Sequence, residues 1–216
     1  MSTETKVDRK AKTLSLVQVS LFSALIIIMA FTPFLGYIPL GFTRATIIHI
    51  PVILGAIMLG PKQGALLGFI FGMTSFINNT MNPTVTSFVF TPFYNLGEMR
   101  GGIGSIIICF LPRILVGVFP FFVYKFCNRM LQKKQNGSNY ALAIAGLIGS
   151  LTNTLLVMNL IFVFFKDSYA AANGIATESV YAFILSIIGM NGVPEAIVAA
   201  VLVSFVGRVL LKVRRV

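Results

Sequence analysis

Apolar residues gather in six stretches along the chain, and polar or turn-forming residues separate each stretch from the next. The stretches cover about residues 14–34, 45–59, the run that follows the turn at 60–62 and ends near 76, 103–130, 140–165 and 179–211. A helix needs about 20 mostly apolar residues to cross a bilayer, and the second stretch is short by this measure. The pattern predicts an all-α integral membrane protein with six transmembrane helices in one bundle.

These boundaries divide the chain into three parts. Residues 1–13 form a polar, basic N-terminal tail, residues 14–211 form a single six-helix membrane domain, and residues 212–216 form a second basic tail. No cleavable signal is expected, because the first apolar stretch is too long and lacks a small-residue cleavage site.

The composition agrees with a membrane protein. Hydrophobic residues make up 56% of the 216 residues and charged residues 11%, and the mean hydropathy is +0.90. A soluble domain is about 25% charged. The net charge of +11 would favour a nucleic-acid partner in a soluble protein, but the positions of the basic residues indicate another role.

Thirteen of the 17 Lys and Arg residues fall at places that share one side of the membrane when the chain crosses six times. They are Lys6, Arg9, Lys10, Lys12, Lys62, Lys125, Arg129, Lys133, Lys134, Arg208, Lys212, Arg214 and Arg215. The positive-inside rule makes that side the cytoplasm. We therefore expect both termini to be cytoplasmic, and we expect no nucleic-acid partner.

Two charged residues interrupt apolar stretches. Arg113 lies near the middle of residues 103–130, and Glu195 lies midway along residues 179–211. A charged side chain at such a depth costs roughly 2.5–3.5 kcal/mol on insertion scales, so it requires a protein interior or a water-filled cavity. The sequence leaves two explanations open: the charges contact a ligand, or they neutralise each other as a structural pair.

Amide side chains lie at a similar depth to Arg113. Arg113, Asn153 and Asn191 are each about 11 or 12 residues from the outer end of their stretch, which corresponds to roughly 16–18 Å along a helix. Glu195 is one turn below Asn191, and Asn159 lies above Asn153. These residues predict a buried pocket for a polar small molecule. The alternative is a set of hydrogen bonds that only join helices.

The long segment between the third and fourth stretches is apolar and aromatic, although it lies outside the membrane. Long loops in compact proteins are often lids or binding loops. We expect residues 84–94 to fold over the bundle as a lid, with packing on lipid headgroups as the alternative. Asn79 and Phe90, which belong to this outer segment, are therefore added to the candidate site.

Small residues repeat at four-residue spacing on two helices. Gly64, Gly68 and Gly72 lie on one face of the third stretch, and Ser20 and Ala24 lie on one face of the first. Such rows allow helices to approach closely in lipid. From the residues alone, packing within the same chain is favoured over packing against a partner.

The sequence gives little support for catalysis. It contains one His, no carboxylate pair with a clear spacing, no metal-ligand cluster, no nucleophile elbow and no redox motif. The phosphate-binding pattern GxxxxGK[ST] is also missing. Cys109 and Cys127 are too far apart on one predicted helix to form a disulfide. We expect a protein that is not an enzyme and that needs no cofactor and no metal.

Three sequence segments resemble a known family. The segment from Ile48 to Ala65, the segment Pro112-Arg113-Ile114-Leu115-Val116-Gly117, and Gly192-Val193-Pro194-Glu195 are similar to the substrate-binding S components of energy-coupling factor (ECF) transporters. The similarity covers nearly the whole chain. Within the family, the long outer segment and the overall pattern look most like the pantothenate-specific members.

The resemblance implies a mechanism and partners. An S component captures a vitamin from outside a bacterial cell, docks on a transmembrane coupling subunit through its first three helices, and topples when two cytoplasmic ATPases act. The chain is then a multi-pass protein of the bacterial cytoplasmic membrane. The alanine pair that is usual on the first helix corresponds here to Ser20 and Ala24, and the resemblance makes this row a docking site.

The residues of the predicted pocket suit pantothenate, which has a carboxylate, an amide and two hydroxyl groups. Arg113 offers a positive charge, and asparagine amides both donate and accept hydrogen bonds. Riboflavin, a thiamin precursor or folate remain alternative substrates. A stand-alone secondary transporter is an alternative of another class, although the sequence lacks the inverted repeat that such proteins often carry.

Overall fold

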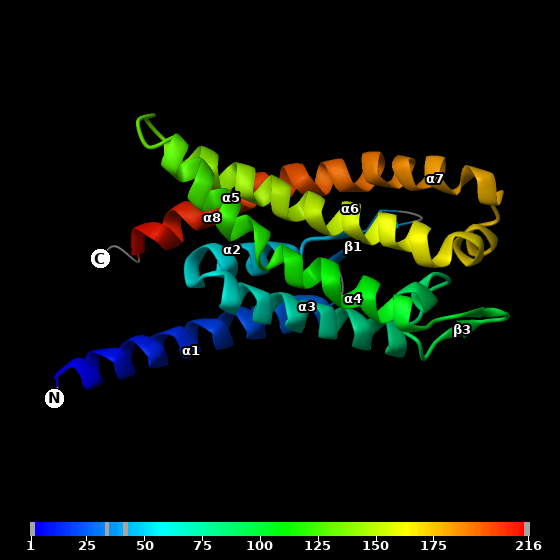
Figure 1. Ribbon diagram of the computed structural model, residues 1–216, viewed down its shortest axis with the longest axis horizontal. Coiled ribbons are helices and arrows are strands. Elements are labelled where there is room, and N and C mark those ends of the chain that lie inside the picture. Colours follow the sequence, from blue (N-terminus) through cyan, green and yellow to red (C-terminus); the bar gives the residue numbers. More distant parts are fainter. Residues whose placement is uncertain (1–2, 33–34, 41–42, 214–216) are drawn as a thin grey trace.

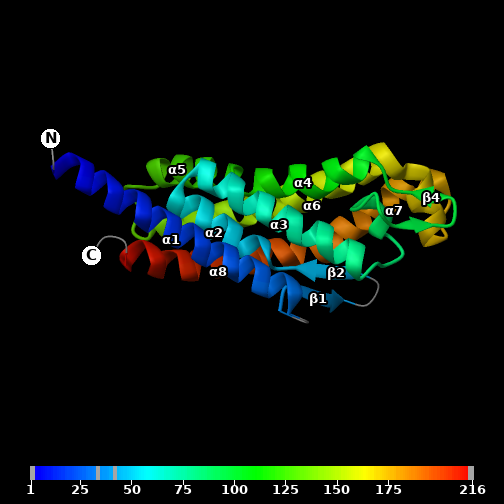
Figure 2. The same cartoon turned by 90° about the horizontal axis from the view of Figure 1, so that it is seen from below.

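The computed structural model describes residues 3–32, 35–40 and 43–213, with the backbone alone for residues 3–11, 37–40 and 43–45. It is an elongated bundle of helices that run along one common direction (Figure 1). The start of helix α1 (Thr3–Phe31) and the end of helix α8 (Val193–Val213) lie at the same end of the bundle (Figures 1 and 2). The described parts of the two predicted basic tails, residues 3–13 and 212–213, belong to these helix ends.

The described residues form eight α-helices arranged in six rods. The helices are α1 (Thr3–Phe31), α2 (His49–Leu59), α3 (Pro61–Met81), α4 (Ile103–Val116), α5 (Phe119–Met130), α6 (Gly137–Asn173), α7 (Val180–Ile187) and α8 (Val193–Val213). The fourth rod consists of α4 and α5, and the sixth of α7 and α8. The remaining elements are short: β1 (Tyr37–Leu40), β2 (Thr43–Thr46), β3 (Asn95–Leu96), β4 (Met99–Arg100), the 3-10 turns Ser87–Val89 and Thr177–Ser179, and the π-turn Ile188–Gly192.

Four of the rods are long and apolar enough to cross a membrane. Among the described residues they are Lys12–Phe31, Ile103–Met130, Gly137–Asn173 and Thr177–Val213. Large apolar side chains on their outer faces are exposed, for example Leu21 and Phe205. An apolar outer surface of this kind is the surface of a membrane protein. The prediction of a helical, multi-pass membrane protein is therefore confirmed.

The two other predicted spans, α2 and α3, are also helices of the bundle. The α2 helix has 11 residues and is roughly 16 Å long at 1.5 Å per residue, which is too short to cross the membrane by itself. All of its residues from His49 to Met58 are buried. The α2 helix is therefore an interior helix that its neighbours surround.

Several predicted boundaries differ from those of the structure. The second stretch was expected to begin as a helix near residue 45, but residues 43–46 form strand β2, which pairs antiparallel with β1. The α1 helix begins within the predicted tail 1–13. Pro33 and Phe34, at the end of the predicted first span, and residues 214–216 of the C-terminal tail lie outside the described residues.

Prolines explain two of the interruptions in the long rods. Pro120 lacks an N–H and cannot bond to the carbonyl of Val116, so the fourth rod breaks between α4 and α5. Pro194 in the same way cannot bond to the carbonyl of Met190, and a π-turn precedes it. The α6 helix continues past Phe165, where it kinks, to Asn173, through the region predicted to be an outer loop.

The glycine row of α3 packs directly on the backbone of α4. A Cβ atom added at Gly68 would collide with the carbonyl oxygen of Arg113 and lie 2.8 Å from Cα of Ile114. One turn earlier, a Cβ at Gly64 would collide with the carbonyl oxygen of Gly117. The predicted packing role of this row is confirmed, and the contact fixes the position of Arg113 relative to α3.

We predict that Gly68→Ala will lower the thermal stability of the purified protein. The added methyl group would push α4 away from α3, and overpacking of this kind costs about 1–3 kcal/mol. Gly189→Ala is the matched control, because nothing lies within 4 Å of a Cβ added there. Thermal unfolding in detergent measures both variants. Equal midpoints for the two would contradict the close helix contact.

Candidate functional site

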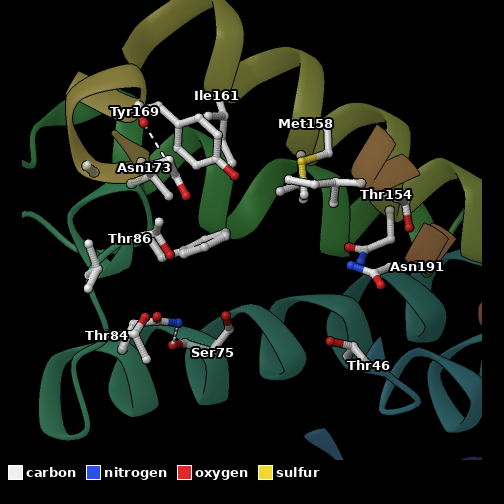
Figure 3. Close-up of a pocket in the computed structure, with 18 of the residues that line it drawn as sticks. Thr46, Ser75, Thr84, Thr86, Thr154, Met158, Ile161, Tyr169, Asn173 and Asn191 are labelled. Atoms are coloured by element: carbon white, nitrogen blue, oxygen red, sulfur yellow. Dashed lines mark hydrogen bonds between the residues drawn. The ribbon is translucent and has the colours of Figure 1, made fainter. Parts of the chain in front are cut away.

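A cavity of about 480 Å³ lies inside the bundle. Its walls come from α3, α4, α6, α7 and α8, from β2 and from the lid segment, which we define as residues 82–102. Its volume falls in the range of roughly 300–1,000 Å³ that is usual for small-molecule sites. In Figure 3, Met158 and Ile161 on α6 face Ser75 on α3 across the hollow.

The cavity has polar groups toward both ends. The hairpin end, named after the β1–β2 hairpin, contains Thr46, Asn153, Thr154, Asn191 and Glu195. The lid end contains Thr84, Thr86, Tyr169 and Asn173 (Figure 3). Apolar side chains of α6, among them Val157, Met158 and Ile161, lie between the two ends. Along the cavity, the side chains of α6 are therefore polar at the hairpin end, apolar in the middle and polar again at the lid end.

Glu195 joins the hairpin to the helices at the hairpin end. One carboxylate oxygen accepts a hydrogen bond of 2.6 Å from the backbone N–H of Thr46, and the other accepts one of 3.4 Å from the Thr154 hydroxyl. The Glu195 side chain is buried, with 8% of its surface exposed. Both oxygens act as acceptors, and each has capacity for a further donor.

Asn153 contributes a buried acceptor next to this carboxylate. Its side chain is 8% exposed, and its Oδ1 atom has no hydrogen-bond partner among the described residues. A buried polar atom without a partner costs about 1–3 kcal/mol. This oxygen is therefore suited to accept a hydrogen bond from a molecule in the cavity.

Arg113 contacts the lid segment. Its guanidinium donates a hydrogen bond of 2.6 Å to the carbonyl oxygen of Ile108, and its Cζ atom lies 5.2 Å from the ring centre of Phe90 and 5.7 Å from that of Phe71. The side chain thus runs back toward the start of α4 and is 7% exposed. Aromatic faces attract a guanidinium, more strongly where water is excluded.

Arg113 and Glu195 make these contacts with different groups. The carboxylate is held by Thr46 and Thr154, whereas the guanidinium is held by Ile108 and two aromatic rings. Both residues line the same cavity.

The lid segment packs down on the bundle. Phe88 and Val89 are fully buried, and the Ser105 hydroxyl of α4 donates a hydrogen bond of 2.6 Å to the carbonyl oxygen of Phe88. Ser87 donates one of 2.9 Å to Oδ1 of Asn79 on α3. The expectation that this apolar segment folds over the bundle is confirmed.

The comparison with protein families decides the assignment of the chain. Residues 14–207 match the model of the family described as "ECF transporter, substrate-specific component". The chain belongs to this family. The family resemblance carried by residues 48–65, 112–117 and 192–195 is therefore confirmed.

Individual relatives of this S component are similar over nearly their whole length. The pantothenic acid transporter PanT of Lactococcus lactis subsp. cremoris is 34% identical over 208 residues, which are 95% of this chain and 98% of that protein. The pantothenate transporter PanT of Leuconostoc mesenteroides is 29% identical over 212 residues, 94% of each chain. A crystal structure of the S component for biotin from an ECF-type ABC transporter matches with a TM-score of 0.44 and 18% identity, over 96% of this chain and 95% of that one.

Six of the seven residues predicted to bind a ligand line the cavity, and one does not. Those that line it are Asn79, Phe90, Arg113, Asn153, Asn191 and Glu195. Asn159 is exposed, and its amide donates to the carbonyl oxygen of Leu155 on its own helix. Six residues along a helix turn the side chain by about 240°, so Asn159 cannot share a face with Asn153.

Both polar atoms of the Asn79 side chain already make hydrogen bonds within the protein. Its Nδ2 atom donates to the carbonyl oxygen of Ser75, and its Oδ1 atom accepts from Ser87 in the lid segment. The amide therefore holds the lid segment against α3 while its side chain lines the cavity.

Six further polar residues line the cavity that were not singled out from the sequence: Thr46, Ser75, Asn78, Thr154, Tyr169 and Asn173. Among them, Thr154 is adjacent to Asn153 in the sequence. Tyr169 and Asn173 fell in a region predicted to be a loop. Their four-residue spacing is a helical signal, and it places both on one face of the continued α6 helix.

The predicted docking residues lie on the outer face of the bundle. Ser20 and Ala24 are exposed on α1, and only 17% of the apolar part of this helix is buried. The α1 helix lies along the edge of the bundle (Figure 1). This row is therefore not used for packing within the chain, contrary to the expectation from the residues alone.

We predict that Ser105→Ala will loosen the lid segment. The variant removes the donor to the buried carbonyl of Phe88, and an unsatisfied buried group costs about 1–3 kcal/mol. Amide hydrogen exchange should become faster in residues 84–94. Ser186→Ala is the control, because that hydroxyl is exposed and bonds within its own helix. Unchanged exchange in residues 84–94 would show that Ser105 does not hold the lid segment.

Proposed function

We propose that this S component binds pantothenate in the cavity and delivers it into the cell as part of an ECF-type ABC importer in the bacterial cytoplasmic membrane. The observation that carries the proposal is the buried Arg113 guanidinium in the wall of a cavity that also presents amide and carboxyl groups. The name of the relative with 34% identity supports the choice of substrate.

The chemistry of the cavity matches the groups of pantothenate. The Arg113 guanidinium is a partner for the single carboxylate, and Asn153 and Asn191 are partners for the amide and the hydroxyl groups. The apolar wall of Val157, Met158 and Ile161 suits the apolar groups of the molecule, which are the two methylene groups beside the carboxylate and the two methyl groups between the hydroxyl-bearing carbons. A cationic ligand would be repelled by Arg113 in surroundings that screen charge poorly.

Two covers close the cavity in this proposal. The lid segment lines it on one side, and the hairpin lines it through Thr46. Binding and release require at least one cover to move, since the ligand is enclosed when both are in place. A ligand that contacts a cover binds the closed state more tightly than the open state, and this difference in affinity shifts the protein toward the closed state.

The energy for delivery comes from partner subunits in this proposal. The chain docks on the transmembrane coupling subunit through the exposed row of Ser20 and Ala24, and two cytoplasmic ATPase subunits supply ATP hydrolysis. Residues 14–211 act as a single membrane domain that topples as a unit. Both tails, 1–13 and 212–216, lie on the cytoplasmic side, in accordance with the distribution of basic residues.

We predict that the purified chain alone will bind pantothenate more tightly than riboflavin, thiamin or folate. A ligand that binds only the folded state stabilises it by RT ln(1 + [L]/Kd), which is about 2.7 kcal/mol at 100 times Kd. Thermal unfolding with each vitamin, followed by calorimetric titration, measures the difference. Stabilisation by another vitamin and not by pantothenate would change the substrate and leave the family unchanged.

We predict that Ala24→Trp will block transport and leave binding intact. A large side chain in the small-residue row would separate the two docked subunits, and every 1.4 kcal/mol or so lost at the interface is a factor of ten in affinity. Uptake of labelled pantothenate into liposomes with the complete importer is compared with binding by the isolated variant. Leu25→Trp is the control, since Leu25 is also exposed on α1, with 44% of its surface accessible, but faces another direction. Normal uptake by Ala24→Trp would exclude this row from docking.

A further inference from the structure

The hairpin end of the cavity offers hydrogen-bond acceptors. Both oxygens of Glu195 already accept hydrogen bonds, from Thr46 and Thr154, and Oδ1 of Asn153 is a buried acceptor without a partner among the described residues. The Asn153 oxygen can accept a hydrogen bond from an O–H or N–H group of a ligand, and each Glu195 oxygen has capacity for one more. A ligand carboxylate placed here would bring two groups of acceptors, and two like charges, together in a dry site.

The guanidinium of Arg113 is the complementary group. It is a donor that carries a permanent positive charge, and its contacts with Phe90 and Ile108 keep it on the side of the lid segment. A carboxylate binds to such a fork of N–H donors with charge-assisted hydrogen bonds. The cavity thus separates a group that selects an anion from groups that select hydroxyls.

We infer that the cavity holds its substrate in one orientation, with the carboxylate on Arg113 and the hydroxyl-bearing end on Glu195 and Asn153. The inference rests on the proposed function, because it takes pantothenate as the substrate. It makes Glu195 a specificity-determining residue that recognises hydroxyl groups. The apolar wall of α6 then lies against the part between the two ends, which includes the two methylene groups of the molecule.

This orientation predicts a specific kind of selectivity. A molecule that lacks the hydroxyl groups leaves Oδ1 of Asn153 without a donor and makes no hydrogen bond to the Glu195 carboxylate, and a site built for hydrogen bonds rejects such analogues strongly. A molecule that lacks the carboxylate leaves Arg113 without its anionic partner. The two losses concern different ends of the cavity, so each can be assigned to its own residue and its own ligand group.

The test combines two variants with two ligand analogues. The analogues are pantothenol, in which an alcohol replaces the carboxylate, and a dideoxy pantothenate, in which hydrogen replaces both hydroxyl groups. Arg113→Gln should lower the affinity for pantothenate and for the dideoxy analogue by about 10- to 100-fold, as expected for hydrogen bonds to a charged group, and hardly change that for pantothenol. Glu195→Gln should lower the affinity for pantothenate and pantothenol by about tenfold or more, and hardly change that for the dideoxy analogue.

Matched controls separate these effects from changes in net charge. Arg129→Gln and Glu178→Gln alter the same residue types at exposed positions outside the cavity, and they should leave all three affinities unchanged. Asn153→Leu, of similar size, removes the unpartnered acceptor. It should behave like Glu195→Gln and serves as the second test if Glu195→Gln lowers the stability of the protein.

The outcomes distinguish the inference from the proposed function. If Arg113→Gln or Glu195→Gln lowers the affinity for all three ligands equally, or if the two variants show each other's pattern of losses, the inferred orientation is wrong. Binding of pantothenate by the unaltered chain would still support the proposed function in that case. Failure of the unaltered chain to bind pantothenate would overturn both.

Discussion

The buried charge of Arg113 constrains the rest of the site. A guanidinium within a membrane helix is costly unless the protein surrounds it with suitable groups. Here one carbonyl oxygen and the faces of Phe71 and Phe90 contact it. Because Phe90 belongs to the lid segment, the lid segment in its present position provides part of the surroundings that stabilise the buried charge. Removing the lid exposes the guanidinium, which then requires water or an anion.

The close contact of α3 and α4 gives this arrangement its geometry. Gly68 brings the α3 backbone against the carbonyl of Arg113, so these two helices leave no space between them there. Polar α3 side chains such as Ser75 lie further along the helix, on the wall opposite α6 (Figure 3). The cavity thus forms where α3 and α6 are held apart and the lid segment fills the remaining opening. The spacing of the glycines thus determines where α3 packs on α4, and this contact in turn determines where the cavity lies.

Hydropathy was sufficient to predict the rods but not the details that position the site. The four long rods and the cavity residues Arg113, Asn153, Asn191 and Glu195 follow from apolar length and misplaced polarity. The hairpin was missed because residues 45 and 46 were assigned to the second apolar stretch, and hydropathy carries no signal for a contact such as that of Thr46 with the distant Glu195. The depth estimate assumed that α6 ends at residue 165, although a kinked helix continues there, and it ignored that Arg113 reaches back along α4.

The inferred orientation of the substrate, with contacts at both ends of the cavity, has a consequence for closure. Glu195 holds the hairpin through Thr46, and Arg113 holds the lid segment through Phe90. A substrate that contacts both side chains therefore stabilises both covers at once, whereas a molecule with only one of the two groups stabilises one. The energy that shifts the protein to its closed state is the difference in affinity between the states. Closure then depends on the complete substrate, and the two ends of the cavity together provide a selectivity that neither end has alone.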